Sequence, residues 1–355
     1  MRVAPVTTAA PSSLSCIARR VEERVRALLA SERARWAAVS PDLAAPFDAL
    51  AQLVLGGGKR LRPAFCHWAF VGAGGDPADP QVVDAGAALE LLHTFALIHD
   101  DIMDGSSTRR SMSTIHVQFE ERHALDGWRG EGRRFGEGVG VLIGDLAFVY
   151  ADHLLAAAPG DAMAVFTELR IEVNLGQFLD LVGTARGSAD EDQACRISLF
   201  KSGKYTVERP LHLGAALAGR LDDLAAPLSA FGLPLGEAFQ LRDDLLGAFG
   251  DETLTGKPVG EDIRDGKPTL LYAAARARVG DRAPLLDRYG AHDLSDGELA
   301  DLQDLLVETG AVARVEATIE DRVAEALGHL GRAPLAATAR EALAELTLYV
   351  AGRDR

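Results

Sequence analysis

The sequence predicts an all-α fold. Apolar residues recur at helical spacing, no segment alternates convincingly between polar and apolar residues, and there is no internal repeat. The 355 residues would fill one large helical domain or two ordinary ones, and a hydrophobic fraction of 48% supports a sizeable core. We expect a disordered tail over residues 1–15 and a single domain over residues 16–355.

The composition excludes several classes of function. A net charge of −15 argues against a nucleic-acid partner, because a phosphate backbone needs a basic footprint. No uninterrupted apolar run is long enough to span a membrane, and residues 1–13 lack the apolar core of a secretion signal. The three cysteines have no C-x-x-C spacing, which is typical of free thiols in a reducing compartment. We therefore expect a cytoplasmic protein.

The expected helices follow one another along the chain, separated by polar turns. They cover residues 15–38, 41–55, 64–71, 139–158, 162–182, 211–218 and 227–250, and further helices follow Pro268. A long apolar helix that starts near residue 82 carries Asp100. Residues 126–138 hold five glycines and six charges, which predicts a mobile surface loop. Gly203 interrupts a helical pattern between Lys201 and Lys204, which indicates a local break that aims both ammonium groups inward.

A glycine-rich basic segment, G-G-G-K-R-L-R-P, occupies residues 56–63. Its glycines let the backbone approach an anion, Lys59 and Arg62 supply charge, and a helix starting near Pro63 would add amide donors. The Walker pattern G-x-x-x-x-G-K-[ST] is absent. The segment therefore predicts a diphosphate site, and an ordinary turn between helices is the alternative.

The chain is organised around residues 90–110, E-L-L-H-T-F-A-L-I-H-D-D-I-M-D-G-S-S-T-R-R. Asp100 and Asp104 are one helical turn apart, so their carboxylates share a face. Magnesium is commonly held by one or two carboxylates together with substrate phosphate oxygens. Arg109 and Arg110 follow and can bind the same phosphates. A solvated helix end is the alternative for this motif alone.

A second acidic cluster strengthens the prediction of a metal site. The segment F-Q-L-R-D-D-L-L-G contains Asp243 and Asp244 on an expected helix. Lysine is rare, and the chain has five: Lys59, Lys201, Lys204, Lys257 and Lys267. Nearly all of them lie in Gly-containing polar segments. This placement favours a functional role, since a compact ammonium group suits phosphate binding.

The motifs together resemble one family. G-G-G-K-R-L-R-P, H-D-D-I-M-D, T-R-R, K-S-G-K, Q-L-R-D-D-L-L-G, T-G-K-P and D-I-R-D-G-K occur in this order over residues 56–267. They resemble the trans-isoprenyl diphosphate synthases, or polyprenyl synthetases. The resemblance implies the isoprenoid synthase type I fold, a large antiparallel helical bundle around a central cavity, and a homodimer. It implies head-to-tail condensation of isopentenyl diphosphate with dimethylallyl, geranyl or farnesyl diphosphate.

The resemblance also implies roles for single residues. Asp100 and Asp104 would bind two magnesium ions and Asp243 a third, with Asp101 and Asp244 as neighbouring ligands or outer-shell partners. The allylic diphosphate would be held by Arg109, Lys201, Ser202, Lys257 and Lys267, and Gln240 would support the second acidic motif. The isopentenyl diphosphate would be held by Gly58, Lys59, Arg62, His93 and Arg110. The catalytic set would be Asp100, Asp104, Lys201, Asp243 and Lys257, whereas Lys204 has no firm counterpart.

This chemistry agrees with the residues themselves. The bond between carbon and diphosphate breaks only if the leaving group is neutralised, which magnesium, Lys and Arg can do. The released diphosphate can take the final proton, so no side-chain base is needed. One departure from the family concerns the second motif, usually D-D-x-x-D, which has Gly247 in the third place. The third position therefore supplies no carboxylate to a metal, but Asp243 remains and we expect activity to survive.

The side chains on the helix before Asp100 predict the length of the product. Ala96 and Leu92 lie about 6 and 12 Å below Asp100 at 1.5 Å per residue, and each isoprene unit adds a similar step. Phe95 is the bulkiest residue near this path. An aromatic residue five positions before the motif and a small one four before resemble the geranylgeranyl-type enzymes. We expect a twenty-carbon product, with farnesyl diphosphate as the second choice.

Two other classes of protein remain as alternatives. A class I terpene cyclase also has a D-D-x-x-D helix. However, the segment beginning at Asn174 lacks the second metal motif of a cyclase. A cyclase would also not need the site formed by Lys59, Arg62 and Arg110, because it binds one diphosphate and not two. A non-catalytic partner subunit would generally have lost acidic residues, and this chain keeps both pairs.

Overall fold

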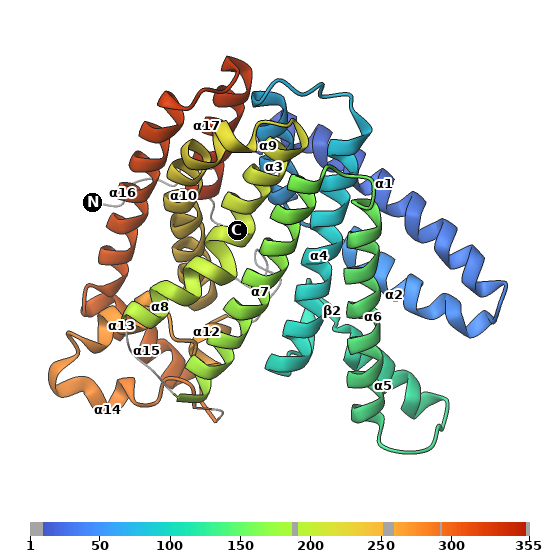
Figure 1. The fold of residues 1–355 in the computed structure, drawn as a ribbon. Helices are drawn as coiled ribbons and strands as arrows, with labels where there is room; N and C mark the ends of the chain where they lie inside the picture. Colours follow the sequence, from blue (N-terminus) through green and yellow to red (C-terminus); the bar gives the residue numbers. More distant parts are fainter. Residues whose placement is uncertain (1–9, 187–190, 251–258, 292, 353–355) are drawn as a thin grey trace. The chain divides into compact units, whose positions relative to one another are not determined.

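The computed structural model describes residues 10–186, 191–250, 259–291 and 293–352, with the backbone alone at residues 191, 193, 198, 201 and 202. Its regular structure is almost entirely helical (Figure 1), which confirms the all-α prediction. The described residues contain one antiparallel pair of strands, β1 (Thr108–Arg109) and β2 (Met112–Ser113).

Contacts divide the chain into two compact units. The N-terminal unit comprises residues Ser12–His67 and Asp76–Pro159, and the C-terminal unit comprises Trp68–Gly75 and the described residues of 160–352. The expected single domain over residues 16–355 stays a prediction. Each unit is described by itself below.

The N-terminal unit is built around the long helix α4 (Pro80–Asp104). Pro80 begins α4 with its fixed φ, the Asp79 side chain accepts a hydrogen bond from the Gln81 amide, and Gly105 ends the helix in a left-handed conformation. The other elements of the unit are α1 (Ser12–Ala37), η1 (Pro41–Leu43), α2 (Ala44–Leu55), the start of α3 (Leu61–Gly72), α5 (Ile115–Leu125) and α6 (Gly132–Leu154).

Helix α4 is long and apolar enough to cross a membrane by length and composition. However, 67% of its apolar window is buried inside the protein, as in the core helix of a globular domain. No other helix in the described part of the chain passes the same test.

Glycines on α6 allow close packing against α4. A Cβ at Gly144 would lie 2.3 Å from Nε2 of His99, and a Cβ at Gly140 would lie 2.7 Å from Cδ1 of Ile102. Larger side chains at these positions would push the two helices apart. The carboxyl-terminal turns of α4, which carry the aspartates, are thereby seated directly on the α6 backbone.

Two expected boundaries in this unit are wrong. The expected tail ends at residue 15, but α1 begins at Ser12; residues 1–9 lie outside the described residues. The expected loop over residues 126–138 is shorter, because α6 begins at Gly132. Glycine there serves helix packing: a Cβ at Gly136 would lie 2.1 Å from the carbonyl oxygen of His116 on α5.

The C-terminal unit packs around α10 (Leu221–Phe249). Its core includes buried residues of α10, α12, α13, α15 and α16, among them Leu245, Ile263, Leu271 and Leu302. The further elements are α7 (Gly160–Arg186), α8 (Glu191–Ser198), η2 (Leu199–Glu208), α9 (Arg209–Leu217), α12 (Glu261–Arg264), α13 (Leu270–Arg276), η3 (Gly280–Arg282), α14 (Ala283–Leu286), α15 (Asp296–Glu308), α16 (Ala311–Arg332) and α17 (Ala337–Ala351).

The break expected near Gly203 is a π-helix. Residues Leu199–Glu208 form the ten-residue element η2, which carries Lys201, Ser202 and Lys204. Gly203 touches α10, since a Cβ at Gly236 would lie 2.4 Å from the Cα of Gly203. Two glycines therefore let the backbones of η2 and α10 meet, and π-helical turns are frequent at functional sites.

Candidate active site

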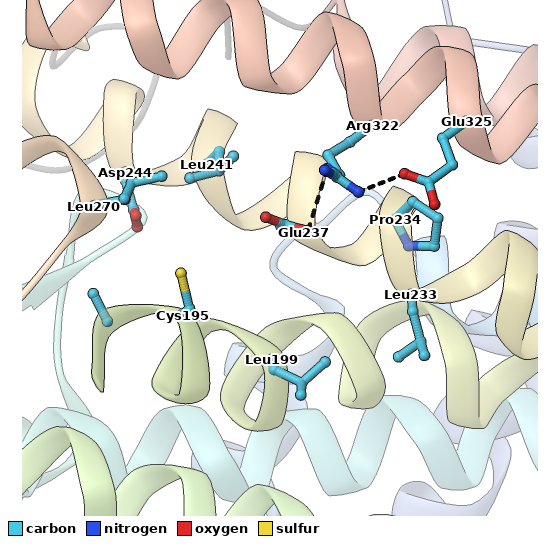
Figure 2. Close-up of a pocket in the computed structure, with 11 residues that line it drawn as sticks. Cys195, Leu199, Leu233, Pro234, Glu237, Leu241, Asp244, Leu270, Arg322 and Glu325 are labelled. Carbon is cyan, nitrogen blue, oxygen red and sulfur yellow. Dashed lines mark hydrogen bonds and ion pairs between the residues drawn. The ribbon is translucent and has the colours of Figure 1, made fainter. Parts of the chain in front are cut away.

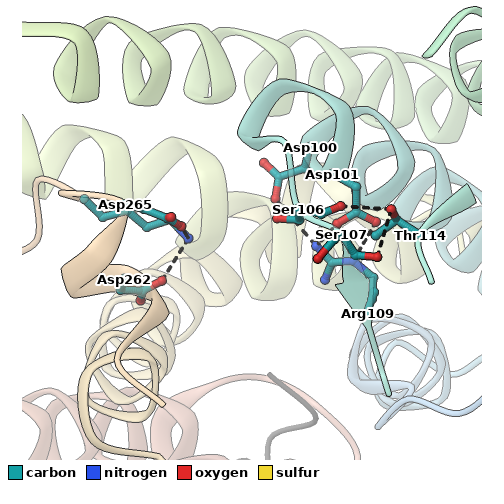
Figure 3. A network of polar contacts seen from close by, with 9 residues as sticks. Asp100, Asp101, Ser106, Ser107, Arg109, Thr114, Asp262 and Asp265 are labelled. Carbon is teal, nitrogen blue, oxygen red and sulfur yellow. Dashed lines mark hydrogen bonds and ion pairs between the residues drawn. The ribbon is translucent and has the colours of Figure 1, made fainter. Parts of the chain in front are cut away.

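The last turn of α4 presents the first acidic motif. Asp100 is half-buried and Asp104 is exposed at the end of the helix. One turn of helix separates them, so both carboxylates lie on the same side of α4. Figure 3 shows Asp100 and Asp101 together with the loop that follows α4.

Asp101 points to a different partner. It is 2% exposed, and Nε of Arg109 donates to its two oxygens at 2.8 and 2.9 Å. Nη2 of Arg109 lies 2.6 Å from Asp101 and 4.0 Å from Asp100 (Figure 3). Asp101 thus fixes the guanidinium beside Asp100, which agrees with an outer-shell position rather than a direct metal ligand.

The loop that carries Arg109 is held by hydrogen bonds. The Ser106 amide donates to the carbonyl of Asp101 at 2.9 Å, and Oγ1 of Thr114 donates to the Ser106 carbonyl at 2.8 Å. Arg110 and Ser111 form the turn between β1 and β2 with φ of 53° and 60°. Two consecutive left-handed residues suit a tight hairpin but are uncommon outside glycine.

The predicted residues for isopentenyl diphosphate gather at one place in the N-terminal unit. Gly58 has φ of 129°, and a Cβ there would lie 3.1 Å from Nη2 of Arg110. Burial lowers the pKa of His93 well below its usual value, and the positive charges of Arg62 and Arg110 lower it further. His93 is therefore neutral at pH 7 within a cluster of arginines that suits an anion.

Arg60 is a residue that sequence reasoning missed. It is 4% exposed and lies in the left-handed region with φ of 51°. Its guanidinium donates to the buried carboxylate of Glu90, to Glu22 at 3.0 Å and to the Val54 carbonyl at 2.5 Å. The glycine-rich loop is anchored through these bonds. A signal was present in the sequence, because a lone Glu90 on an apolar helix needs a buried cation.

The residues that were predicted to set product length also lie in the N-terminal unit. Leu92 is fully buried, Phe95 is 9% exposed and Ala96 is half-buried. The Phe95 ring lies 4.6 Å from the His99 ring and 4.9 Å from the ring of Phe148 on α6. Phe148 was not predicted, since no sequence spacing pairs two residues on different helices.

The second acidic motif lies on α10. Asp243 is half-buried and Asp244 is 7% exposed, and Nε2 of Gln240 donates to Oδ1 of Asp244 at 2.6 Å. Burial raises the pKa of Asp244 to about 8; the Gln240 bond lowers it, and the charges of Asp262 and Asp243 raise it. Gln240 thus contacts the motif that it was expected to support.

The lysines divide into three groups. Nζ of Lys267 lies 2.8 Å from Oδ1 of Asp262, close to the second acidic motif. Lys201 and Ser202 lie on η2 with only their backbone described, and Lys257 lies outside the described residues. Lys204, which had no expected role, donates to the 4%-exposed Glu172.

Glu172 is the centre of a buried ionic network. Arg209 binds its two oxygens at 2.6 and 2.7 Å, and Lys204 binds one of them as well. Burial raises the pKa of Glu172, but the bonds from Arg209 and Lys204 outweigh that effect and leave it below its usual value. Glu172 is therefore ionised at pH 7, and it ties η2 to α7.

The C-terminal unit contains a cavity of about 300 Å³ beside α10. Residues of α8, η2, α13 and α16 complete its walls. Figure 2 shows Asp244 towards one end and Arg322 between Glu237 and Glu325 at the other, with a distance of 3.6 Å from Arg322 to Glu237. Because Asp244 contributes to its wall, the cavity reaches the second acidic motif.

The donor set suits a hard cation. Both motifs offer carboxylate oxygens, which magnesium and calcium prefer. Within the described residues, no three His, Cys, Asp or Glu side chains converge closely enough to hold a metal unaided. Magnesium is commonly held by one or two carboxylates together with substrate phosphate oxygens.

Comparison with known proteins identifies the family. The polyprenyl synthetase family model matches residues 45–306. A geranylfarnesyl diphosphate synthase of Aeropyrum pernix is 31% identical over 311 residues, covering 85% of this chain and 92% of that protein. A geranylgeranyl diphosphate synthase of Sulfolobus acidocaldarius is 32% identical over 278 residues, covering 76% of this chain and 78% of that protein.

A solved structure shows the same fold. The crystal structure of geranylgeranyl pyrophosphate synthase from Corynebacterium glutamicum, complexed with isoprenyl diphosphate and magnesium, matches with a TM-score of 0.90. The two chains are 34% identical, and the match covers 95% of this chain and 99% of that one. The predicted isoprenoid synthase type I fold is therefore confirmed. With a family model over most of its length and relatives matched nearly end to end, the chain belongs to the polyprenyl synthetase family and is a prenyltransferase that makes a short-chain prenyl diphosphate.

Proposed function

We propose that this enzyme condenses isopentenyl diphosphate head to tail with an allylic diphosphate, and that its main product is geranylgeranyl diphosphate. The observation that carries the product length is the packing of Phe95 against Phe148, 4.9 Å between ring centroids. The two rings form a wall beside the half-buried Ala96, about one turn of helix below Asp100. Relatives include geranylfarnesyl, geranylgeranyl and farnesyl synthases, so side chains of this kind must decide among products.

The allylic diphosphate would bind through both acidic motifs. Asp100 and Asp104 would supply oxygen ligands at the end of α4, and Arg109 is held beside Asp100 by Asp101. Magnesium, with three ions in each active site, would neutralise the leaving diphosphate. The proposed partners on the C-terminal unit are Lys201, Ser202, Gln240, Asp243, Asp244, Lys257 and Lys267.

The isopentenyl diphosphate would bind at the arginine cluster. Gly58 lets the backbone approach the anion, and Lys59, Arg62 and Arg110 supply positive charge. His93 is neutral, because burial and the arginines lower its pKa, and so it can donate a hydrogen bond without adding charge. No side-chain base is needed for the last step, because the released diphosphate can accept the proton.

A homodimer is the assembly that the exposed surface favours. Val141, Leu142 and Val149 are large apolar residues exposed on α6, and Ile171, Leu175 and Phe178 are exposed on α7 at helical spacing. Such rows of apolar side chains mark interaction sites. Leu142→Glu should give a monomer by light scattering after gel filtration, whereas a dimer of unchanged mass would reject α6 as the interface. We also propose that residues 16–355 form one catalytic domain that works in the cytoplasm.

The decisive experiment is a product assay. The purified enzyme is incubated with Mg²⁺, isopentenyl diphosphate and each allylic starter in turn, and the products are sized by chromatography. We expect the twenty-carbon diphosphate from all three starters. A fifteen-carbon product alone would refute the length assignment, and a cyclic hydrocarbon from a single prenyl diphosphate would indicate a cyclase. Turnover only after adding a partner protein would indicate a non-catalytic subunit.

A further inference from the structure

His99 lies directly before the first acidic motif and is not among the proposed ligands of metal or diphosphate. Residues four apart on a helix lie one above the other, so the His99 side chain lies next to that of Phe95. The two ring centroids are 4.6 Å apart at an interplanar angle of 62°, which is an edge-to-face arrangement. Phe95 therefore contacts two rings, His99 on its own helix and Phe148 on α6.

Two groups on α6 fix the orientation of the imidazole. Nε2 of His99 lies 3.1 Å from the carbonyl oxygen of Val141, and because a carbonyl can only accept, this nitrogen carries the proton and donates. Oδ1 of Asp145 lies 3.9 Å from the same nitrogen and favours a proton there. The His99 side chain is 17% exposed, so solvent covers little of it. The hydrogen bond to α6 thus determines which edge of the ring meets Phe95.

Gly144 provides the space that the imidazole occupies. A Cβ at Gly144 would lie 2.3 Å from Nε2, 2.4 Å from Cδ2 and 3.3 Å from Cε1 of His99, so its three nearest neighbours all belong to one ring. A side chain at this position would displace the imidazole or separate the two helices. Val141, Gly144 and Phe148 recur at helical spacing, so one face of α6 contacts both rings of α4.

The orientation of Phe95 matters because the growing hydrocarbon is proposed to pass beside it. The proposed path runs from Asp100 past Ala96, and the Phe95 ring closes it. With Phe148 as its only aromatic neighbour, the Phe95 ring would have other rotamers open to it, and some of these leave the path clear.

We infer that His99 is a positioning residue for product length: it keeps the Phe95 ring in the orientation that stops chain growth. Gly144 is then required because it admits the imidazole. This inference deepens the proposed function, on which it rests, by adding to the wall a residue that does not line the path itself.

The test is the ratio of the next longer product to the main product. The full-length enzyme is incubated with Mg²⁺, isopentenyl diphosphate and farnesyl diphosphate, and the products are sized by chromatography. His99→Ala removes one of the two rings that contact Phe95. We expect this ratio to rise about two- to tenfold, which corresponds to the loss of one aromatic pair.

His123→Ala is the matched control, because His123 makes the same two kinds of contact elsewhere in the unit. Its Nε2 lies 3.1 Å from the carbonyl oxygen of Arg129, and its ring lies 5.3 Å from the ring of Phe135. His123 is 6% exposed, so its removal should lower Tm. The product ratio should stay that of the wild type. A general effect of losing a buried histidine would appear in both variants.

Gly144→Ala tests the same ring from the other helix. The added Cβ displaces the imidazole, so Tm should fall and the product ratio should rise as in His99→Ala. In the double variant Gly144→Ala, His99→Ala the clash is absent. Its Tm should therefore exceed that of Gly144→Ala, and its product ratio should equal that of His99→Ala.

A wild-type product ratio in His99→Ala or in Gly144→Ala would overturn the inference, as would an equal rise in His123→Ala. The ratio is defined relative to the main product of the wild type, so this test does not depend on which length that product has. A wild-type enzyme that forms no prenyl product, or whose main product does not have twenty carbons, would overturn the proposed function instead.

Discussion

The ring of Phe148 lies 4.9 Å from the ring of Phe95 and supports it from the neighbouring helix. We therefore expect Phe95→Ala and Phe148→Ala each to lengthen the product by at least one isoprene unit, because each opens the wall. The double variant should shift the distribution further. Products are sized by chromatography after incubation with farnesyl diphosphate.

Leu125→Ala is the control for this pair, since Leu125 is an apolar residue of the same unit that is 87% exposed and has no proposed role. Its product should be that of the wild type. An unchanged distribution in both phenylalanine variants would mean that the floor of the cavity is formed by other residues.

The buried pair of Arg60 and Glu90 should stabilise the enzyme and its glycine-rich loop. Glu90→Gln leaves the Arg60 guanidinium, 4% exposed, without its main counter-charge. We expect a loss of about 3 kcal/mol in the free energy of unfolding, measured in urea. KM for isopentenyl diphosphate should rise, because Gly58 and Lys59 precede Arg60 directly.

Asp48→Asn is the matched control, because it breaks the exposed pair of Arg33 and Asp48 in the same unit. It should change neither the unfolding curve nor KM. If Glu90→Gln and Asp48→Asn had the same free energy of unfolding and the same KM, Arg60 would not hold the loop.

Asp244 should make the metal-free enzyme less stable as the pH rises. Its pKa is about 8 in the folded protein, above its value in an unfolded chain, so the folded state holds the extra proton between about pH 4 and pH 8. Stability from this group is present at low pH and falls by up to about 1.4 kcal/mol per pH unit across that window.

Asp244→Asn removes this dependence. In EDTA, the Tm of the variant should exceed that of the wild type by a margin that grows from pH 5 to pH 8. A constant difference across that range would show that Asp244 is already ionised at pH 5. Comparing the two proteins at each pH cancels the contributions of the other titrating groups.

Lys204 should stabilise η2 without binding substrate. Glu172 binds both Lys204 and Arg209, so Glu172→Gln should cost about 3 kcal/mol of unfolding free energy. Lys204→Met should cost less, since Arg209 keeps both oxygens of Glu172. KM for the allylic diphosphate should not change in Lys204→Met, and a large increase would mean that Lys204 contacts the diphosphate.

The sequence predicts those features that depend only on residues close together in the chain. Helical periodicity predicts α4 and α10, and the one-turn spacing of Asp100 and Asp104 is enough to place both carboxylates on one face of a helix. The break at Gly203 was also predictable, because glycine in a helical pattern weakens the helix at that point. Motif order was sufficient to indicate the family, which the comparisons confirmed.

The residues that were missed depend on contacts between distant segments. Arg60 binds Glu90, which is thirty residues away in the chain. The Asp262 carboxylate lies beside Gly247 on another helix, and no sequence spacing predicts that contact. The glycines at residues 132–138 indicated a loop by composition, but these residues are helical and Gly136 allows α5 and α6 to pack closely. Sequence shows that a residue is small, whereas only the packed structure shows what occupies the space beside it.

The glycines of α6 determine how product length can change. With His99 and Ile102 seated on Gly144 and Gly140, α4 has no freedom to move closer to α6, and moving away would break these contacts. Space for a longer hydrocarbon must then come from replacing side chains such as Phe95 with smaller ones. Enzymes with this backbone should consequently diversify in product size through point substitutions, with the helical frame conserved in shape.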